Sequence, residues 1–350
     1  FEAQTPPKVT DFAFEGCNKL KIIIPSNNEA CVNYLESDLS DDFVKKISNL
    51  DYFPQENIIR YTTTDGKIAD PTSYYDDYNI NLVIHNTINN GEGITTFRRG
   101  IKTFMGFESD KETTLSRRLP NGVEKIGVVA FYNCTNLREI NIPDSCMEIG
   151  ASAFSGCTNL TEITIPNNCT KLGSQTFYYC DNLVKANILG SLEKIENSTF
   201  ASCKNLTEIT IPESCVKIGD EAFFDCTNLE EISIPENCNK LGRLAFCSCS
   251  NLVKVNILGK LEKIEENTFQ DCHKLKEVNI PESCVEIGKS AFWNCFKLKT
   301  VTIPRNCTKL GEGAFGGAGL TSIELPDELS TIPKNAFRNC RITEITIPEA

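Results

Sequence analysis

Histidine, tryptophan and methionine are scarce in this chain, with only two, one and two copies among 350 residues. Because histidine is a frequent general acid–base catalyst and a common zinc ligand, its scarcity leaves any acid–base catalysis to carboxylates and disfavours histidine-based metal sites. No apolar run approaches the roughly 18 residues that a membrane-spanning helix needs, and no signal-peptide pattern is found. The start, Phe1-Glu2-Ala3, is typical of a processed or cloned fragment, so we expect any export signal or anchor to have been removed.

Basic residues are also in deficit, since 35 Lys and Arg stand against 47 Asp and Glu, for a formal net charge of −12. This balance argues against nucleic acid and anionic membrane as partners. No nucleophile motif, phosphate-binding loop or zinc signature occurs. His273 stands where other repeats carry Thr or Lys, which indicates a variable turn position, and His85 has no assigned role. We therefore predict no catalytic residue, no cofactor and no metal.

The abundant feature is a fixed period. Nine phenylalanines, which we call the comb, follow one another at intervals of 23 residues: Phe131, Phe154, Phe177, Phe200, Phe223, Phe246, Phe269, Phe292 and Phe315. A period of this length is typical of a solenoid, in which each coil buries its apolar face only against its neighbours. Carboxylates that could act as acid or base have near-copies one coil away, whereas an active site is a singular constellation, so we predict that the chain is not an enzyme.

One repeat shows how a coil is built. Thr161–Ile165 alternates polar and apolar residues, which predicts a short strand with its isoleucines inward, and Pro166 ends it. Gly150 indicates a tight corner before Phe154. Asn159 recurs in other repeats and is expected to satisfy turn backbone groups between coils.

A second period of 69 residues lies above the first. Lys185–Gly190 returns as Lys254–Gly259, with leucine in place of the strand-ending proline. In the same units glutamate replaces the corner glycine, as at Glu196 and Glu265. We interpret this as duplication of a three-repeat block.

The 18 cysteines fall largely into two columns of the repeat, three and fifteen residues after the comb position. Ala318, Leu192 and Leu261 fill vacancies in these columns, which predicts small or apolar buried groups and therefore mainly free thiols. Cysteines of neighbouring coils are close enough for disulfides to be considered, but their side chains are poorly oriented for the required dihedral angle. A row of metal sites would be expected to include more histidines. Cys31 and Cys247 lie outside both columns, and Cys247 is predicted to be the exposed thiol.

The chain divides into three predicted parts. Residues 1–50 hold one isolated repeat and a helical segment, Asn28–Ile47, that could cap a preceding array. Residues 51–106 are predicted to be a β-rich lead-in, with a hairpin signal at Asp65-Gly66. Residues 107–350 form the main array, with a degenerate first unit near Phe107.

The unit Ile211 to Pro235, Ile-Pro-x-Ser-Cys-x-x-Ile-Gly-x-x-Ala-Phe-x-x-Cys-x-x-Leu-x-x-Ile-x-Ile-Pro, resembles the BspA-like (Treponema-type) leucine-rich repeat. The resemblance covers roughly 107–350 and 5–25, and its cysteine after Ser is a departure, because the family commonly has valine there. It implies a right-handed leucine-rich-repeat solenoid on a microbial surface, cell-bound or secreted, of a kind often proposed to mediate adhesion.

Two outward columns of the predicted strands make the candidate binding face. Short polar groups and charged groups alternate along it, so the face is expected to be flat, wettable and acidic. Its residues are Glu139, Asn141, Glu162, Thr164, Lys185, Asn187, Glu208, Thr210, Glu231, Ser233, Lys254, Asn256, Glu277, Asn279 and Thr302.

Three hypotheses remain for the array. The first is adhesion or protein–protein binding through this face, to a host, matrix or neighbouring-cell protein, by a chain that is expected to be a monomer. The second is a passive spacer whose solvated face only keeps the sheet soluble. The third is capture of a polysaccharide, which exposed aromatic residues on the strand columns would favour, and those columns contain almost none.

Overall fold

The computed structural model describes strands at residues 58–63, 83–89, 92–97, 103–104 and 113–115, followed by residues 119, 121–345 and 347. The predicted repeat at 5–25, the helical segment Asn28–Ile47 and the turn at Asp65-Gly66 lie outside these residues. The division at residues 50 and 106 stays a prediction. The described residues contain no α-helix, and so none long and apolar enough to cross a membrane.

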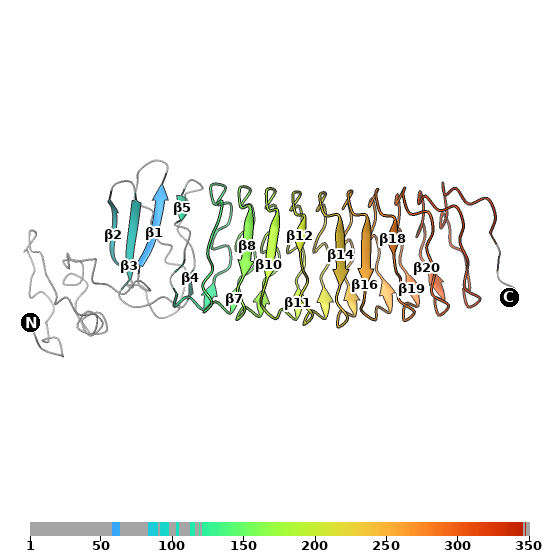
Figure 1. Ribbon diagram of the computed structural model, residues 1–350, viewed down its shortest axis with the longest axis horizontal. Coiled ribbons are helices and arrows are strands. Elements are labelled where there is room, and N and C mark those ends of the chain that lie inside the picture. Colours follow the sequence, from blue (N-terminus) through green and yellow to red (C-terminus); the bar gives the residue numbers. More distant parts are fainter. Residues whose placement is uncertain are drawn as a thin grey trace, which may run out of the picture.

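Stacked coils build an elongated solenoid, as predicted (Figure 1). Each coil contributes short parallel strands whose partners lie 23 residues apart, as in the register Glu162↔Lys185↔Glu208. The first ladder contains β8 (Glu162–Ile165), β10 (Lys185–Ile188), β12 (Glu208–Ile209), β14 (Glu231–Ile234), β16 (Lys254–Ile257) and β18 (Glu277–Val278).

A second ladder runs along the opposite edge of the coils, where β7, β11 and β19 are labelled in Figure 1. Its strands have two residues each, and in those from residue 125 onward the first is exposed or half-exposed and the second is buried. They are β4 (Thr103–Phe104), β6 (Lys125–Ile126), β7 (Glu148–Ile149), β9 (Lys171–Leu172), β11 (Lys194–Ile195), β13 (Lys217–Ile218), β15 (Lys240–Leu241), β17 (Lys263–Ile264), β19 (Glu286–Ile287) and β20 (Lys309–Leu310).

The 69-residue period is visible as interruptions of both ladders. The first ladder divides into the three-stranded sheets β12-β10-β8 and β14-β16-β18, and the second into sheets of four, three and three strands. In the middle strands of the first ladder, leucine replaces proline and supplies one more N–H to the ladder. Leu189 N donates to Ile165 O and Leu258 N to Ile234 O, both at 3.0 Å, which a proline cannot do.

The phenylalanine comb is a continuous stack through the core, as predicted. The rings of Phe131 to Phe315 are fully buried, and each is nearly parallel to the next, with centroids 4.8 Å apart at the start of the stack. Phe337 continues the stack at 5.8 Å from Phe315. At the other end the ring on Phe131 is that of Phe104, tilted by 32°, while Phe107 lies outside the described residues.

The cysteines of the described residues are free thiols, and both predicted columns are buried or half-buried. Most of these thiols also have a hydrogen-bonding role that the column pattern alone does not reveal. In the first column Cys157 Sγ donates to Phe131 O at 3.1 Å, and the pattern recurs along the array, for example from Cys180 to Phe154. Cys17 and Cys31 lie outside the described residues.

The prediction that Cys247 is exposed is wrong, because only 3% of it is accessible. Its column, directly after the comb, alternates small buried residues such as Ala201 and Cys247 with large half-buried ones such as Phe224. The larger side chains take up the space beside the smaller ones on this wall. A small residue in such a column is therefore covered even outside the core.

The corner glycine is required by close approach of the preceding coil. A Cβ on Gly150 would lie 2.6 Å from the backbone carbon of Gly127. The recurring asparagine bonds between coils as predicted, with Asn159 Nδ2 donating to Thr135 O at 2.7 Å. Asparagines of neighbouring coils also bond to each other, since Asn182 Nδ2 donates to Asn159 Oδ1 at 3.3 Å.

The segment before the solenoid contains an antiparallel sheet with the order β2-β3-β1-β5. Its strands are β1 (Ile58–Thr63), β2 (Val83–Asn89), β3 (Glu92–Phe97) and β5 (Thr113–Leu115). Only residues 90 and 91 separate β2 from β3, whose register pairs Asn89 with Glu92. β4 belongs instead to the second ladder, where it pairs with β6.

Candidate functional site

The predicted binding face lies on the outer side of the first ladder and of the coils that extend it. In β8 and β14 the outward residues are exposed and the inward isoleucines buried, as the alternation predicted. All fifteen predicted residues are exposed or half-exposed. We call this surface the strand face.

The strand face is less acidic than its sequence suggests, because lysines are placed between glutamates. Lys185 Nζ lies 2.7 Å from Glu208 Oε2, and Lys254 Nζ lies 3.8 Å from Glu277 Oε2. The hydrogen bond that Lys185 donates to Glu208 raises the pKa of Lys185. Each three-stranded sheet thus carries the charge order minus, plus, minus, and the interruption between β12 and β14 separates Glu208 from Glu231. Like charges directly opposite each other in a ladder are destabilising. The sheet is thus interrupted at the point where two glutamates would otherwise be paired.

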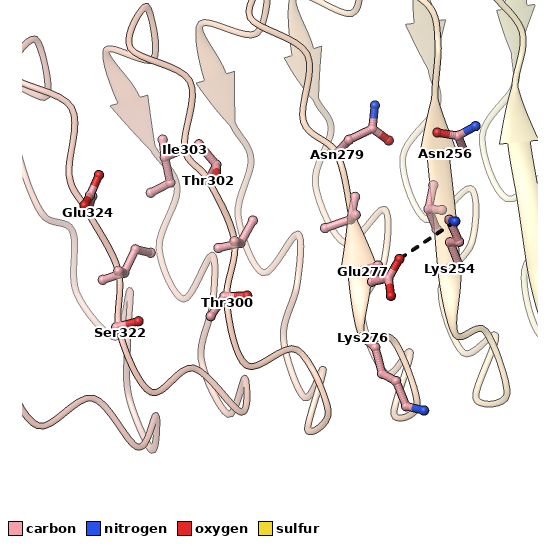
Figure 2. Close-up of a pocket in the computed structure, with 14 residues that line it drawn as sticks. Lys254, Asn256, Lys276, Glu277, Asn279, Thr300, Thr302, Ile303, Ser322 and Glu324 are labelled. Atoms are coloured by element: carbon pink, nitrogen blue, oxygen red, sulfur yellow. Dashed lines mark ion pairs between the residues drawn. The ribbon is translucent and has the colours of Figure 1, made fainter.

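A shallow hollow of about 590 Å³ lies on the C-terminal part of the strand face (Figure 2). It begins beside β16 and β18 and continues over the coils at residues 300–303 and 322–324, where the first ladder has ended. Polar groups line it together with Val255, Val278, Val301, Ile303 and Ile323. The polar lining residues are Lys254, Asn256, Lys276, Glu277, Asn279, Thr300, Thr302, Ser322 and Glu324.

Asn279 takes over the pairing where β18 ends. Its Oδ1 accepts from Ile257 N at 2.8 Å, and its Nδ2 donates to Ile257 O at 2.7 Å. The side-chain amide therefore replaces the backbone of β18 as the partner of β16 beyond Val278. Both of its polar ends are occupied, so Asn279 shapes the hollow more than it offers groups to a ligand.

The sequence-based prediction of the face included Lys254, Asn256, Glu277, Asn279 and Thr302. It left out Lys276 and Thr300 and also missed Ser322 and Glu324. The spacing shortens by one residue in that repeat, which hides these two from a strict 23-residue column. It also missed the second ladder as a charged surface. The signal there was a lysine two residues after the second cysteine column, as in Cys169 and Lys171.

The histidines do not form a site with other metal-binding groups in the described residues. The ring of His273 stacks on that of Phe296 with centroids 5.0 Å apart, and His273 Nε2 lies 3.8 Å from Asp271 Oδ1. His85 belongs to β2, where it is in register with Thr96. Within the described part of the chain, no group of three His, Cys, Asp or Glu side chains is arranged to hold a metal ion.

Short parallel strands on 23-residue coils around a stacked phenylalanine core define a leucine-rich repeat solenoid. The profile of the BspA type leucine rich repeat region matches residues 106–223, 193–318 and 241–350. The chain belongs to this family.

Solved structures that resemble the chain are bacterial proteins of the same repeat class. A leucine-rich repeat protein from Bacteroides ovatus is 25% identical, with 74% of this chain and 84% of that chain covered and a TM-score of 0.40. The pneumococcal vaccine antigen PcpA is 22% identical over 65% of this chain and 66% of its own, with a TM-score of 0.45. The leucine-rich repeat protein of T. pallidum is 22% identical over 59% and 80%, with a TM-score of 0.38. No match to a curated protein is found.

Proposed function

We propose that this chain is a non-enzymatic cell-surface or secreted protein that binds another protein through the strand face. The observation that carries the proposal is the hollow, where the ladder opens and leaves polar groups around a floor of valine and isoleucine. A partly apolar floor with a polar rim is the usual anatomy of a protein-binding surface. The partner expected from this face is a host, matrix or neighbouring-cell protein with polar and basic groups.

The charge pattern supports a choice of partner. Glu162 and Glu231 make no ion pair in the described part of the chain, while Glu208 and Glu277 are partly neutralised by lysines. Complementary charges at the rim mainly affect association rate and selectivity. A basic partner is therefore favoured over an acidic one.

The experiment compares two matched substitutions, Thr302→Arg and Thr164→Arg. Both threonines are exposed and occupy the same column, but only Thr302 lines the hollow. Binding of the whole chain to intact cells and to an array of purified matrix proteins is measured for each variant. We expect Thr302→Arg to weaken binding at least about tenfold, because the long cationic side chain fills the hollow, and Thr164→Arg to leave it within about twofold.

Three other results would contradict the proposal. Equal binding by both variants and the unmodified chain would show that the strand face is not the contact surface. Absence of any protein partner would leave the passive spacer, and selective capture of neutral glycans would favour the polysaccharide alternative.

A further inference from the structure

The outward residues of the second ladder follow a simple charge pattern with one exception. Its three sheets carry, in register, Lys125-Glu148-Lys171, then Lys194-Lys217-Lys240, then Lys263-Glu286-Lys309. The outer sheets alternate in sign, whereas the central one is entirely basic. Five successive coils, from Lys171 to Lys263, therefore present lysine, and we call these five residues the lysine ladder.

The alternating sheets show the arrangement that satisfies these charges. Glu148 Oε1 lies 3.2 Å from Lys125 Nζ and 3.1 Å from Lys171 Nζ. Glu286 bridges Lys263 and Lys309 in the same way, at 3.2 Å on each side. Partial burial tends to raise the pKa of Glu148, but the hydrogen bonds from both lysines outweigh it, and its pKa lies below the ordinary value.

The central sheet lacks this compensation. In the described part of the chain, no carboxylate lies within ion-pairing distance of Lys194, Lys217 or Lys240. All three side chains are exposed or half-exposed. Stacked strands lie about 4.8 Å apart, so the arrangement places like charges side by side, which is unfavourable in a ladder.

Comparison of the duplicated 69-residue blocks shows that one residue, Lys217, accounts for the missing ion pairs. Lys217 occupies the position equivalent to Glu148 and Glu286, in otherwise similar segments: Ser214-Cys215-Val216-Lys217-Ile218-Gly219 compares with Ser283-Cys284-Val285-Glu286-Ile287-Gly288. A glutamate there would bridge two lysines, as it does in both neighbouring blocks. Packing and hydrogen bonding therefore do not explain Lys217, and its stability cost points to a ligand.

We propose that the lysine ladder binds a linear sulfated polysaccharide. Its three unpaired rungs, Lys194, Lys217 and Lys240, span about 10 Å, two intervals of about 4.8 Å, and the ion-paired Lys171 and Lys263 extend the row at its two ends. The interval between rungs is comparable to the length of one sugar residue along a polysaccharide, so successive sulfates can meet successive ammonium groups. Lysine suits this role because its compact charge on a flexible stem adapts to irregularly placed sulfates.

Two other polyanionic surfaces fit less well. Single-stranded nucleic acid is bound on stacking aromatic side chains, but the residues preceding the central lysines are Glu193, Val216 and Asn239. The strand face of a second copy of this chain would offer the unpaired Glu162 and Glu231, which are three coils apart and cannot match three consecutive lysines. The lysine ladder is also separate from the strand face, so the two binding proposals fail or succeed independently.

The decisive variant is Lys217→Glu in the full chain, with heparin fragments of defined length as the probe. The new carboxylate restores the alternating pattern and engages Lys194 and Lys240, so none of the three unpaired cations remains available to the ligand. We expect the affinity for heparin to fall about tenfold or more and its salt dependence to become shallower. The thermal midpoint should stay equal or rise, which separates lost binding from unfolding.

Lys334→Glu is the matched control, because Lys334 is exposed, makes no ion pair among the described residues and gives the same change in net charge. We expect its heparin affinity to stay within about twofold of the unmodified chain. Equal loss in both variants, or no heparin binding by the unmodified chain, would overturn the proposal. So would loss on Lys297→Glu instead, which lies in the separate basic patch of Lys274, Lys276, Lys297 and Lys299.

Two further measurements test the choice of ligand. Polyphosphate and single-stranded DNA of matched charge compete with heparin in the same assay, and equal competition would overturn the assignment to a polysaccharide. Sedimentation velocity without ligand reports self-association. A concentration-dependent dimer that Lys217→Glu abolishes would assign the ladder to a second copy of the chain.

Discussion

Each coil holds two residues in the left-handed backbone region, one two positions before the comb phenylalanine and one two positions after it. Asn133 and Ser152 are examples, with φ of 57° and 52°. Glycine or asparagine adopts this conformation at low cost, while a β-branched residue is a clear outlier. The backbone there is fixed by bonds to the next coil, such as Val129 N to Ala151 O at 3.0 Å. The coil geometry thus imposes the strain on whichever side chain occupies these positions.

Val129 is the residue at which this strain should be easiest to relieve. Its φ is 54°, and 51% of it is exposed, so little packing is lost on substitution. We expect Val129→Asn to raise the free energy of unfolding by about 1 kcal/mol, measured by denaturant unfolding. Val128→Asn is the control, because Val128 is equally exposed at 52% but is not in the left-handed region. A gain in both variants, or in neither, would contradict this explanation.

At the scale of the element, the thiols of the cysteine columns donate weak hydrogen bonds in a buried environment, to the preceding coil in the first column and within the same coil in the second. Burial raises the pKa of Cys134 to about 11 and that of Cys169 to about 12, from an ordinary value of 9.0. It also raises the pKa of Cys284 to about 11. The folded state therefore keeps these thiols protonated where the unfolded chain would ionise.

This difference predicts alkaline destabilisation. Below pH 9 both states are protonated and the thiols add no pH dependence, whereas between about 9 and 11 only the unfolded state loses its protons. The free energy of unfolding should fall in that window by about 1.4 kcal/mol per pH unit for each such thiol. Denaturant unfolding at a series of pH values from 8 upward measures the slope. In Cys134→Ala, which follows the natural Ala318 of this column, the slope should be shallower by one thiol, and an unchanged slope would contradict the prediction.

Much of this element structure could be predicted because each repeat carries the same local signals. The strand at Thr161–Ile165, the stacked comb and the buried cysteines follow from periodicity and burial alone. What could not be predicted depends on contacts between particular neighbours. Cys247 is covered by larger residues of adjacent coils, and beyond Val278 the side chain of Asn279 takes the place of a strand partner for Ile257.

The candidate binding surfaces, too, could be predicted only in part from the sequence. The columns of the strand face could be placed from the sequence, but the ion pair between Lys185 and Glu208 and the hollow could not. Both depend on which strands actually pair and where the ladder stops. That Lys217 differs from Glu148 and Glu286 is visible in the sequence. Only the structure shows that each of these glutamates forms ion pairs with two lysines, which Lys217 cannot do.

For the whole molecule, the coils form a one-dimensional stack in which each contacts only its neighbours, so position along the axis should decide the cost of a mutation. Phe223 lies between Phe200 and Phe246, with ring centroids at 5.5 and 5.2 Å. Phe337 stacks on Phe315 alone among the described residues, and it is only half-buried.

Phe223→Ala should therefore reduce the free energy of unfolding by about 3–5 kcal/mol, the usual cost of a large cavity, and Phe337→Ala by less than half of that. The terminal coil can fray without disturbing the rest, whereas a central cavity weakens two interfaces and can split the array into separately unfolding parts. Denaturant unfolding gives the two energies, and amide hydrogen exchange locates the loss, which should stay within the last coils for Phe337→Ala. Equal destabilisation by the two substitutions, or loss of protection along the whole array in both, would contradict nearest-neighbour stacking and indicate a single cooperative core.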